Sequence, residues 1–288
     1  MNTGITQAGH RPHRQRGIAL IIVLWLLVLL TVIAASHARI IRTETRLAAN
    51  HVEAGRARSM AEAGTYHAIM EMLVSENTQR WPVNGSINRI RYEDGHVAIA
   101  IRDARGLVDI NSASAAVLDT VLAGAGMEQQ GQRQALVDAI LDWRDRDNLK
   151  HLNGAEDDDY RRAGLSWAAR DGDFSSIEEF RYVLGMSNPL FAQLAPYLTI
   201  HSGQAGVKLD YAPPWLVSVL SARQDFSGSG NSTARGGGST FHITVWATTT
   251  GGSSASLDTV VHIAAGSDLP YRILSWHTPA RSTAVNAG

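Results

Sequence analysis

Acidic residues gather between Asp142 and Asp159, and this segment is the strongest candidate in the chain for binding chemistry. Seven carboxylates stand there against three basic side chains, Arg144, Arg146 and Lys150. The acidic residues are Asp142, Asp145, Asp147, Glu156, Asp157, Asp158 and Asp159. Carboxylate oxygens in such density suit a hard cation such as calcium, which takes about six to eight oxygen ligands.

The spacing of these acids predicts which of them share a site. Asp145 and Asp147 lie at the end of an expected helix, and a turn at Asn153-Gly154 can bring the following acids back toward that end. We therefore predict calcium ligands at Asp145, Asp147, Glu156 and Asp157, with Asp158 as a further candidate. The spacing is not that of an EF-hand. A solvated acidic loop, partly neutralised by its arginines, is the alternative.

Other site chemistries find little support in the sequence. The chain has no cysteine, and His151 is the only histidine between His96 and His201, which disfavours zinc. No nucleophile-elbow, HExxH or P-loop motif occurs. Paired carboxylates occur only in the acidic segment, where no apolar run indicates a pocket that would raise one pKa. We expect that the protein is not an enzyme.

The elements around the acidic segment alternate in type. The sequence has helical character from about 107 to 199, and a shorter helix follows at Pro213–Leu220. Alternating apolar residues predict strands on both sides of this block, at Ile87–Tyr92, His96–Asp103, Phe241–Thr248, Leu257–Ala264 and Tyr271–Trp276. A Gly/Ser-rich loop is expected at 227–239. The fold class is therefore α+β, with an all-α domain inserted between strands of an antiparallel sheet.

The N-terminal region predicts a membrane anchor. Ile18–Ala35 is apolar except for Thr31, and as a helix it would span roughly 27 Å, close to a bilayer core of about 30 Å. It is longer than the apolar part of a cleaved secretory signal. The helical pattern continues from Ser36 to about Val74, and we expect an apolar stripe of Tyr66, Ile69, Met70 and Leu73 to pack on the globular domain.

Several motifs resemble those of one family. Arg16-Gly17 before a long apolar helix is similar to the leader of type IV prepilins and type II secretion pseudopilins. The segments GLVDINSASAAVL, AILDWRDRDN, NGAEDDDYRRAGL and FSSIEEFRYVLGM resemble, in order, the helical insertion of minor pseudopilin K of the type II secretion system. The resemblance implies cleavage between Gly17 and Ile18 by a prepilin peptidase. Most pilins carry Glu at the fifth mature position, whereas this chain has Ile22, as K members do.

The same resemblance implies an organisation and a function. Residues 1–17 would be the leader, 18–35 the transmembrane segment, 36–106 the pilin-like helix and first strands, 107–202 the helix-hairpin-helix-like insertion, and 203–288 the rest of the β domain. The family also implies calcium in the insertion. It implies a cap at the pseudopilus tip, anchored in inner-membrane lipids with a cytoplasmic N-terminus, and minor pseudopilins I and J as partners.

Two alternatives remain open from the sequence. A minor pilin of a type IV pilus would share the leader and the long helix but would not be expected to carry the acidic insertion. The helix-hairpin-helix-like segments also raise the possibility of DNA binding. Residues 107–200, however, hold 8 Lys/Arg against 15 Asp/Glu, a net charge of −7. Phosphate binding calls for a basic excess, so we expect no nucleic-acid partner.

Overall fold

The computed structural model describes residues 16–73, 81–222, 238–264 and 269–278. The chain divides into two units, one up to Glu53 and the other from Ala54 onward. Most of the predicted leader and most of the Gly/Ser-rich loop lie outside the described residues.

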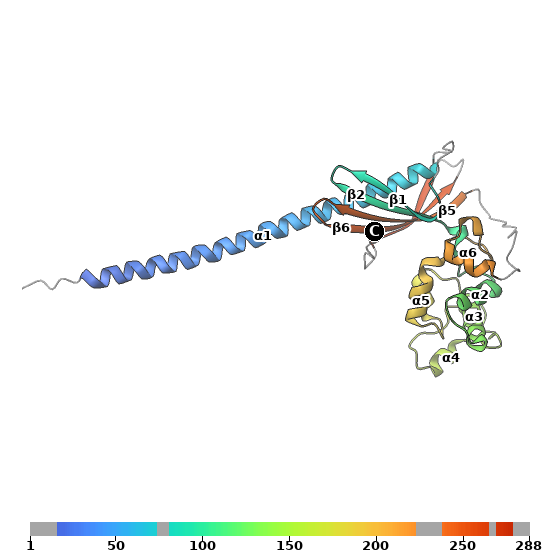
Figure 1. Ribbon diagram of the computed structural model, residues 1–288. Coiled ribbons are helices and arrows are strands. Elements are labelled where there is room, and N and C mark those ends of the chain that lie inside the picture. Colours follow the sequence, from blue (N-terminus) through green and yellow to red (C-terminus); the bar gives the residue numbers. More distant parts are fainter. Residues whose placement is uncertain (1–15, 74–80, 223–237, 265–268, 279–288) are drawn as a thin grey trace, which may run out of the picture. The chain divides into compact units, whose positions relative to one another are not determined.

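Helix α1, Arg16–Leu73, begins the described chain and runs for 58 residues (Figure 1). Alanine and leucine are its commonest residues and proline is absent, so local propensity favours an unbroken helix. Its stretch Leu20–His37 is long and apolar enough to cross a membrane, and none of that stretch is buried within the protein. The expected continuity between the apolar segment and the domain helix is confirmed.

The second unit contains a five-stranded antiparallel sheet, with the strand order β1-β2-β5-β6-β7 (Figure 1). Its strands are β1 Asn84–Tyr92, β2 Gly95–Asp103, β5 Gly238–Thr249, β6 Ser254–Ala264 and β7 Tyr271–His277. Each overlaps a strand predicted from alternating residues. The α+β class with a helical block between strands is therefore confirmed.

The end of α1 packs on the sheet through small and large apolar side chains. Ala61, Ala68, Met60 and Ile69 are buried in one cluster with the alternate apolar residues of β2 and β5. Of the predicted stripe, Ile69 is buried and Leu73 packs against the same cluster, whereas Tyr66 and Met70 are 48% and 60% exposed. The prediction is therefore confirmed for two of these residues and wrong for the other two. The alanines let the helix backbone approach the sheet closely.

The helical block has its own core. Its elements between the two halves of the sheet are α2 Ala115–Gly124, α3 Gln130–Arg144, α4 Asp157–Arg162, η2 Ile177–Tyr182, α5 Asn188–Leu194 and η3 Ala195–Tyr197, followed by η4 Leu209–Tyr211 and α6 Pro214–Ser221. Leu122, Leu136 and Ile140 are buried in one apolar cluster there. Leu216 and Leu220 of α6 belong to the same cluster. The helical core thus extends past residue 202, the boundary expected from the sequence.

The block leaves and rejoins the sheet at one place. Beyond β2, the short 3-10 helix η1 Ala104–Gly106 leads to β3, Val108–Asp109, which pairs in parallel with β4, Leu198–Thr199. The buried Asp109 accepts hydrogen bonds from the backbone of Asn111 at 2.9 Å, Ser202 at 2.8 Å and Gly203 at 2.7 Å. Both ends of the insertion are therefore held by one carboxylate.

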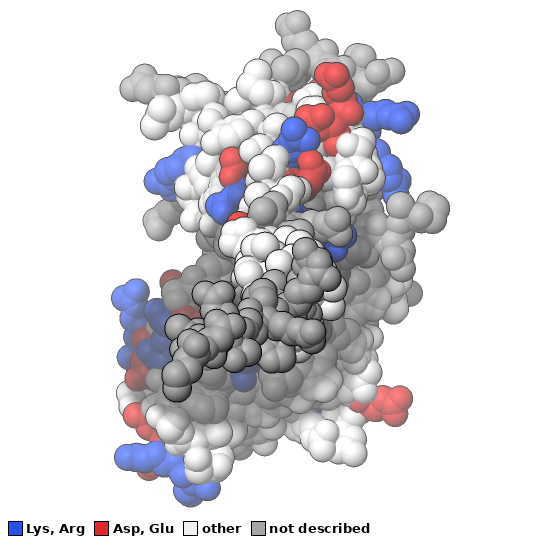
Figure 2. All heavy atoms as spheres, turned by 90° about the vertical axis from the view of Figure 1, so that its left-hand side faces the viewer, with Lys and Arg blue, Asp and Glu red and all other residues white. Residues whose placement is uncertain are grey.

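Charged side chains of both signs are interspersed on the face shown in Figure 2. Among the described residues visible there, lysine and arginine do not merge into one continuous basic surface. The described residues of this face therefore offer phosphates no continuous basic surface.

We expect Gly64→Ala to destabilise the second unit because its backbone touches the sheet. An added Cβ would lie 2.8 Å from Val97 Cγ1 and 3.0 Å from Val245 Cγ1. The overpacking should cost about 1–3 kcal/mol, a fall of several degrees in melting temperature. Circular dichroism of the full chain in detergent measures it. Gly55→Ala is the matched control, since no atom lies within 4 Å of its added Cβ. Equal melting of the two variants would contradict the close-packing account.

Candidate metal centre

Two acids of α3 and the aspartate that directly follows the helix lie one or two helical turns apart on one side of it. Asp138, Asp142 and Asp145 are spaced at i, i+4 and i+7, which places them along a single face. Asp138 and Asp142 are buried, whereas Asp145 stands at the C-terminal end of the helix and is only partly exposed. The loop after α3 folds back over this face.

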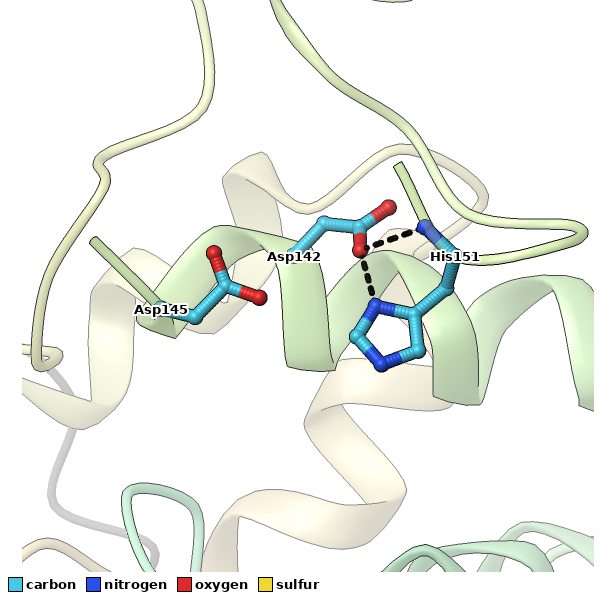
Figure 3. Close-up of side chains that lie close together, drawn as sticks. All are labelled: Asp142, Asp145 and His151. Atoms are coloured by element: carbon cyan, nitrogen blue, oxygen red, sulfur yellow. Dashed lines mark hydrogen bonds and ion pairs between the residues drawn. The ribbon is translucent and has the colours of Figure 1, made fainter. Parts of the chain in front are cut away.

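Asp142 fastens that returning loop to α3. Its Oδ1 accepts the backbone N–H of His151 at 3.0 Å and contacts His151 Nδ1, as Figure 3 shows. Its Oδ2 accepts the backbone N–H of Ala155 at 2.7 Å. A Cβ at Gly154 would lie only 1.8 Å from the same Oδ2, so glycine is required for this approach. Asp138 adds a bond of 3.1 Å from the backbone of Asn153. These two acids are thus occupied in holding the loop.

Other carboxylate oxygens in this region are buried without any hydrogen-bond partner in the described chain. They are Asp145 Oδ1, Glu156 Oε1 and Oε2, Asp157 Oδ1 and Asp171 Oδ1. A buried polar atom without a partner carries its full desolvation cost, and a buried carboxylate carries more. Such atoms in native proteins indicate a missing partner. A cation is the partner that could serve several of them at once.

The carboxyl groups in this region affect one another's pKa values. Burial, followed by the charges of Asp142, Asp171, Asp145 and Asp157, raises the pKa of Glu156 to about 7. Burial and then the charges of Asp147 and Asp142 raise the pKa of Asp145. Burial and the charge of Asp157 raise the pKa of Asp171. Burial is the largest cause of each shift, and repulsion between the carboxylates adds to it. A bound cation would oppose that repulsion.

Helix α4 leaves the Glu156 carboxylate available. The Glu156 N–H donates to Asp159 Oδ2 at 3.1 Å, and the Asp159 N–H donates to the main-chain oxygen of Glu156 at 2.7 Å. Asp159 also pairs with Lys150 and Arg162, at 2.9 Å each. The helix start is therefore satisfied by Asp159 and by backbone, without the side chain of Glu156.

The predicted ligands separate into two groups in the structure. Asp145, Glu156 and Asp157 each contribute a buried oxygen without a partner. Asp147 is exposed and accepts the Leu149 N–H at 2.9 Å, although its charge acts on Asp145. Asp158 is exposed and pairs with Arg161. The geometry does not support Asp158 as a ligand, because its place in the first turn of α4 turns it toward solvent.

Asp171 is a candidate that sequence reasoning missed. It lies in the segment between α4 and η2 and has a positive φ of 55°, a conformation that aspartate tolerates better than most residues. The Asp171-Gly172 pair indicates a turn, and the Gly172 N–H donates to Trp143 of α3 at 3.4 Å. The turn was detectable from the sequence, but its position beside the end of α3 was not.

The donor set fits a hard cation better than zinc. Asp142, Asp145 and His151 offer donor atoms that all lie within 4.8 Å of one another (Figure 3). His151 Nδ1 is already engaged by Asp142, however. The oxygens without partners are all carboxylate oxygens. Carboxylate oxygen is the ligand that calcium prefers.

The predicted cleavage site lies at the beginning of α1. Gly17 and Ile18 are the second and third residues of this helix. Ile22, the fifth residue after the predicted cut, follows within the exposed apolar stretch.

Two families match parts of the chain. Residues 93–203 match the family described as "Type II secretion system (T2SS), protein K". Residues 16–65 match the family described as "PilX N-terminal". The first match covers the helical block up to β4, including every candidate metal ligand, but not η4 or α6. The second covers most of α1.

Curated relatives carry the same family name. Type II secretion system protein K of Pectobacterium carotovorum is 28% identical over 219 residues, which are 64% of this chain and 62% of that protein. The Klebsiella pneumoniae protein K is 27% identical over 65% of this chain and 63% of its own length. The protein K of Aeromonas hydrophila is 27% identical over 73% and 71%. The chain thus matches a little over three fifths of the length of the first two relatives.

One solved structure has the same fold. It is a chain of the GspK-GspI-GspJ complex from the type 2 secretion system of enterotoxigenic Escherichia coli. The TM-score is 0.57 at 14% identity, and the match covers 83% of this chain and 100% of the other. At this identity the likeness concerns the fold.

We expect calcium to raise the melting temperature of the full chain, since a ligand that binds only the folded state stabilises it. Saturation at a hundred times the dissociation constant would add about 2.7 kcal/mol, or roughly 5–10 °C for a unit of this size. The double variant Glu156→Gln/Asp145→Asn should lose most of that gain. In chelator it should melt at or above the unmodified protein, because it removes buried carboxylates that repel one another.

Differential scanning calorimetry in detergent, with chelator, magnesium or calcium, measures both the melting temperature gained with calcium and the change in chelator. Asp158→Asn is the control and should keep the calcium response, since its carboxylate is exposed and paired with Arg161. Identical melting of the metal-free protein with calcium and with chelator would support the alternative that the segment is a solvated acidic loop.

Proposed function

We propose that this chain is a member of the type II secretion system protein K family, and that it is a minor pseudopilin that caps the tip of the secretion pseudopilus. In this role it initiates assembly of the filament and supports protein export across the outer membrane. The observation that carries the proposal is the match of residues 93–203 to protein K, on a chain that also has a long apolar helix and an antiparallel sheet.

The anchor part of the proposal rests on α1. The stretch Leu20–His37 would hold the subunit in the inner membrane, with its N-terminus cytoplasmic and the later unit in the periplasm. Prepilin peptidase would cut between Gly17 and Ile18 before assembly. In the filament the apolar helices would pack against those of neighbouring subunits, where shape fit rather than water exclusion decides association.

The tip position is supported by Ile22. A carboxylate within a bilayer costs at least about 2.5 kcal/mol unless it is paired. Pilins that carry Glu at the fifth mature position are thought to pair it with the terminal amine of a neighbour. With Ile22 in place of Glu, this subunit has no carboxylate that must pair with a neighbour's terminal amine in the membrane. The first subunit of a filament has no earlier neighbour to pair with, so Ile22 suits that position.

The helical insertion supports the same position. It has its own buried core and is held at both ends through Asp109. A structured domain added to a pilin-like unit would obstruct the stacking of a further subunit. The similar solved chain assembles with GspI and GspJ. We propose the corresponding minor pseudopilins I and J as partners here.

Calcium would complete the insertion. We propose Asp145, Glu156, Asp157 and Asp171 as its main carboxylate ligands, with Asp147 close by. The cation would lock the loop after α3 and the start of α4 into one arrangement. The loop has no cysteine with which a disulfide could do the same.

A minor pilin of a type IV pilus is the second candidate. It would account for the anchor and α1, but it leaves the match of residues 93–203 without a role. DNA binding is disfavoured by the charge of the insertion, and no part of the proposal requires catalysis.

Processing at Gly17 is the first test of this function. We expect the mature chain to begin at Ile18, and Gly17→Val to remain uncut because its branched side chain crowds the backbone that the peptidase must approach. Mass spectrometry of protein extracted from membranes identifies the N-terminus. Ala34→Val, far from the cut, is the control and should be processed normally. A mature N-terminus after Ala35 would contradict the proposed cleavage by prepilin peptidase.

The tip position can be tested by immunogold labelling of sheared filaments in cells that overproduce the major subunit. We expect label at filament ends only. Ile22→Glu should still insert into the membrane, because one carboxylate costs only a few kcal/mol against a long apolar span. It should also enter positions along the shaft. The conservative control Ile22→Leu should stay at the ends. Label along the length of unmodified filaments would mean that the protein is an ordinary shaft subunit.

The steric part of the proposal needs a deletion that respects the observed core. Because α6 shares the core of the insertion, the deletion should remove Leu107–Ser221 rather than stop at residue 202. The remaining sheet keeps its strand pairing, since β2 and β5 bond directly to each other. We expect longer or more numerous filaments under major-subunit overproduction, measured by electron microscopy. Filaments of unchanged length and number, with normal variant levels, would refute steric capping.

A further inference from the structure

A cavity of about 410 Å³, lined by polar and apolar residues alike, lies between the sheet and the helical insertion. Arg102 of β2, His242 of β5 and Asp258 of β6 line it from the sheet. His201, which follows β4, lines it from the insertion, together with Ser175, Ser176 and the acidic Glu178. The sheet residues neighbour one another in register, since Arg102 pairs with His242. None of them belongs to the acidic site.

Arg102 lines this cavity without a hydrogen-bonded acceptor among the described residues. Burial lowers the pKa of its guanidinium, and the charge of Asp258 raises it. Gly85 lies so close that an added Cβ would stand 2.9 Å from Arg102 Nε. This partly buried guanidinium has five donors, and Asp258 acts on it through its charge but forms no hydrogen bond or ion pair with it.

The groups around Arg102 favour a ligand with both an acceptor and a donor. Burial lowers the pKa of His201, and burial with the nearby charges of His201 and Arg102 lowers that of His242 to about 3. Both rings are therefore neutral near pH 7, and each offers one N–H and one acceptor nitrogen. His242 Nε2 lies 3.0 Å from Thr199 Oγ1. Asp258 Oδ1 is buried and lacks a hydrogen-bond partner in the described chain.

The lining also extends across the sheet. It runs from Arg102 on β2, over β5 and β6, to Ser275 and His277 on β7. Three steps between neighbouring strands correspond to roughly 14 Å at about 4.8 Å per step. An extended peptide of about four residues covers that distance at roughly 3.3 Å per residue. Within the described sheet, β7 is also an outer strand.

We propose that this cavity is a binding site for an extended peptide segment that carries a carboxylate. The Arg102 guanidinium binds the carboxylate, with the bidentate geometry for which arginine is suited. Asp258 Oδ1 accepts a backbone N–H of the same segment and repels a simple anion. The inference is independent of the tip function, since it rests on this cavity alone.

The test uses the full chain in detergent with ring-¹³C-labelled histidine. The probes are the peptide Ac-Ser-Asp-Ser-NH₂, its neutral match Ac-Ser-Asn-Ser-NH₂, and inorganic phosphate. The NMR signals of His201 and His242, assigned through His201→Gln and His242→Gln, should shift saturably with the Asp peptide and much less with the Asn peptide. Arg102→Gln should weaken Asp-peptide binding roughly tenfold or more, as expected for a lost charge-assisted bond.

Two further variants keep the proposal open to refutation if Arg102→Gln folds poorly. Asp258→Asn removes a like charge and should tighten binding of phosphate, an effect that misfolding could not produce. Arg89→Gln, at an exposed arginine of β1, is the matched control and should bind as the unmodified chain does. Equal affinity for the Asp and Asn peptides, or no effect of Arg102→Gln, overturns the site. Phosphate binding tighter than the Asp peptide overturns the peptide assignment.

Discussion

The closure of the helical insertion by Asp109 is the constraint on which the rest of the second unit depends. Its carboxylate receives backbone N–H groups from both sides of the excursion, next to the parallel pair β3 and β4. The two ends therefore lie side by side. Because they do, β2 and β5 can pair without interruption from Gly95↔Thr249 to Asp103↔Phe241. Well over a hundred residues separate these strands in sequence, yet the sheet core under α1 is undisturbed.

An aromatic cluster performs the equivalent task for the acidic site. Trp143 lies 5.8 Å from Tyr160 and 5.8 Å from Phe174 between ring centroids, and all three are buried. Each ring belongs to a different segment that supplies an acid a few residues away: Asp145 after Trp143, Asp157 before Tyr160 and Asp171 before Phe174. Apolar packing thus forces together carboxylates that repel one another. The hydrophobic gain holds the arrangement, and the unsatisfied oxygens are its consequence.

The sequence predicts the regular elements well because each is encoded locally. Alternation in His96–Asp103 and Leu257–Ala264 marks the strands, and the apolar run after Gly17 marks the anchor. The buried face of α1 was predicted only in part. Ile69 and Leu73 pack on the sheet cluster as expected, but Tyr66 and Met70 are exposed, and Ala61 and Ala68 are buried there as well. Which of these residues are buried depends on strands far along the chain and is invisible in a helical window.

The candidate metal ligands also differ in whether the nearby sequence is enough to predict them. Asp145, Glu156 and Asp157 could be predicted from the sequence because a turn at Asn153-Gly154 connects them within a short segment. Asp158 was included since spacing alone cannot tell which acid in a first helical turn faces inward. Asp171 was missed because tertiary contacts, such as that of Phe174 with Trp143, bring its segment back to the end of α3. Sequence proximity therefore found the local ligand candidates, while the remaining one required the tertiary core.

Two places in the second unit hold ionisable groups without hydrogen-bonded partners, and the groups at the two places carry charges of opposite sign. On the insertion, buried carboxylate oxygens lack a cation. Between insertion and sheet, the Arg102 guanidinium has no hydrogen-bonded acceptor among the described residues, although Asp258 acts on it through its charge. Burial of charged groups without close partners opposes stability. Both arrangements would therefore gain from an ion or a molecule that supplies the missing partner. Such a dependence on binding would suit the role proposed for this chain as a subunit of a secretion filament.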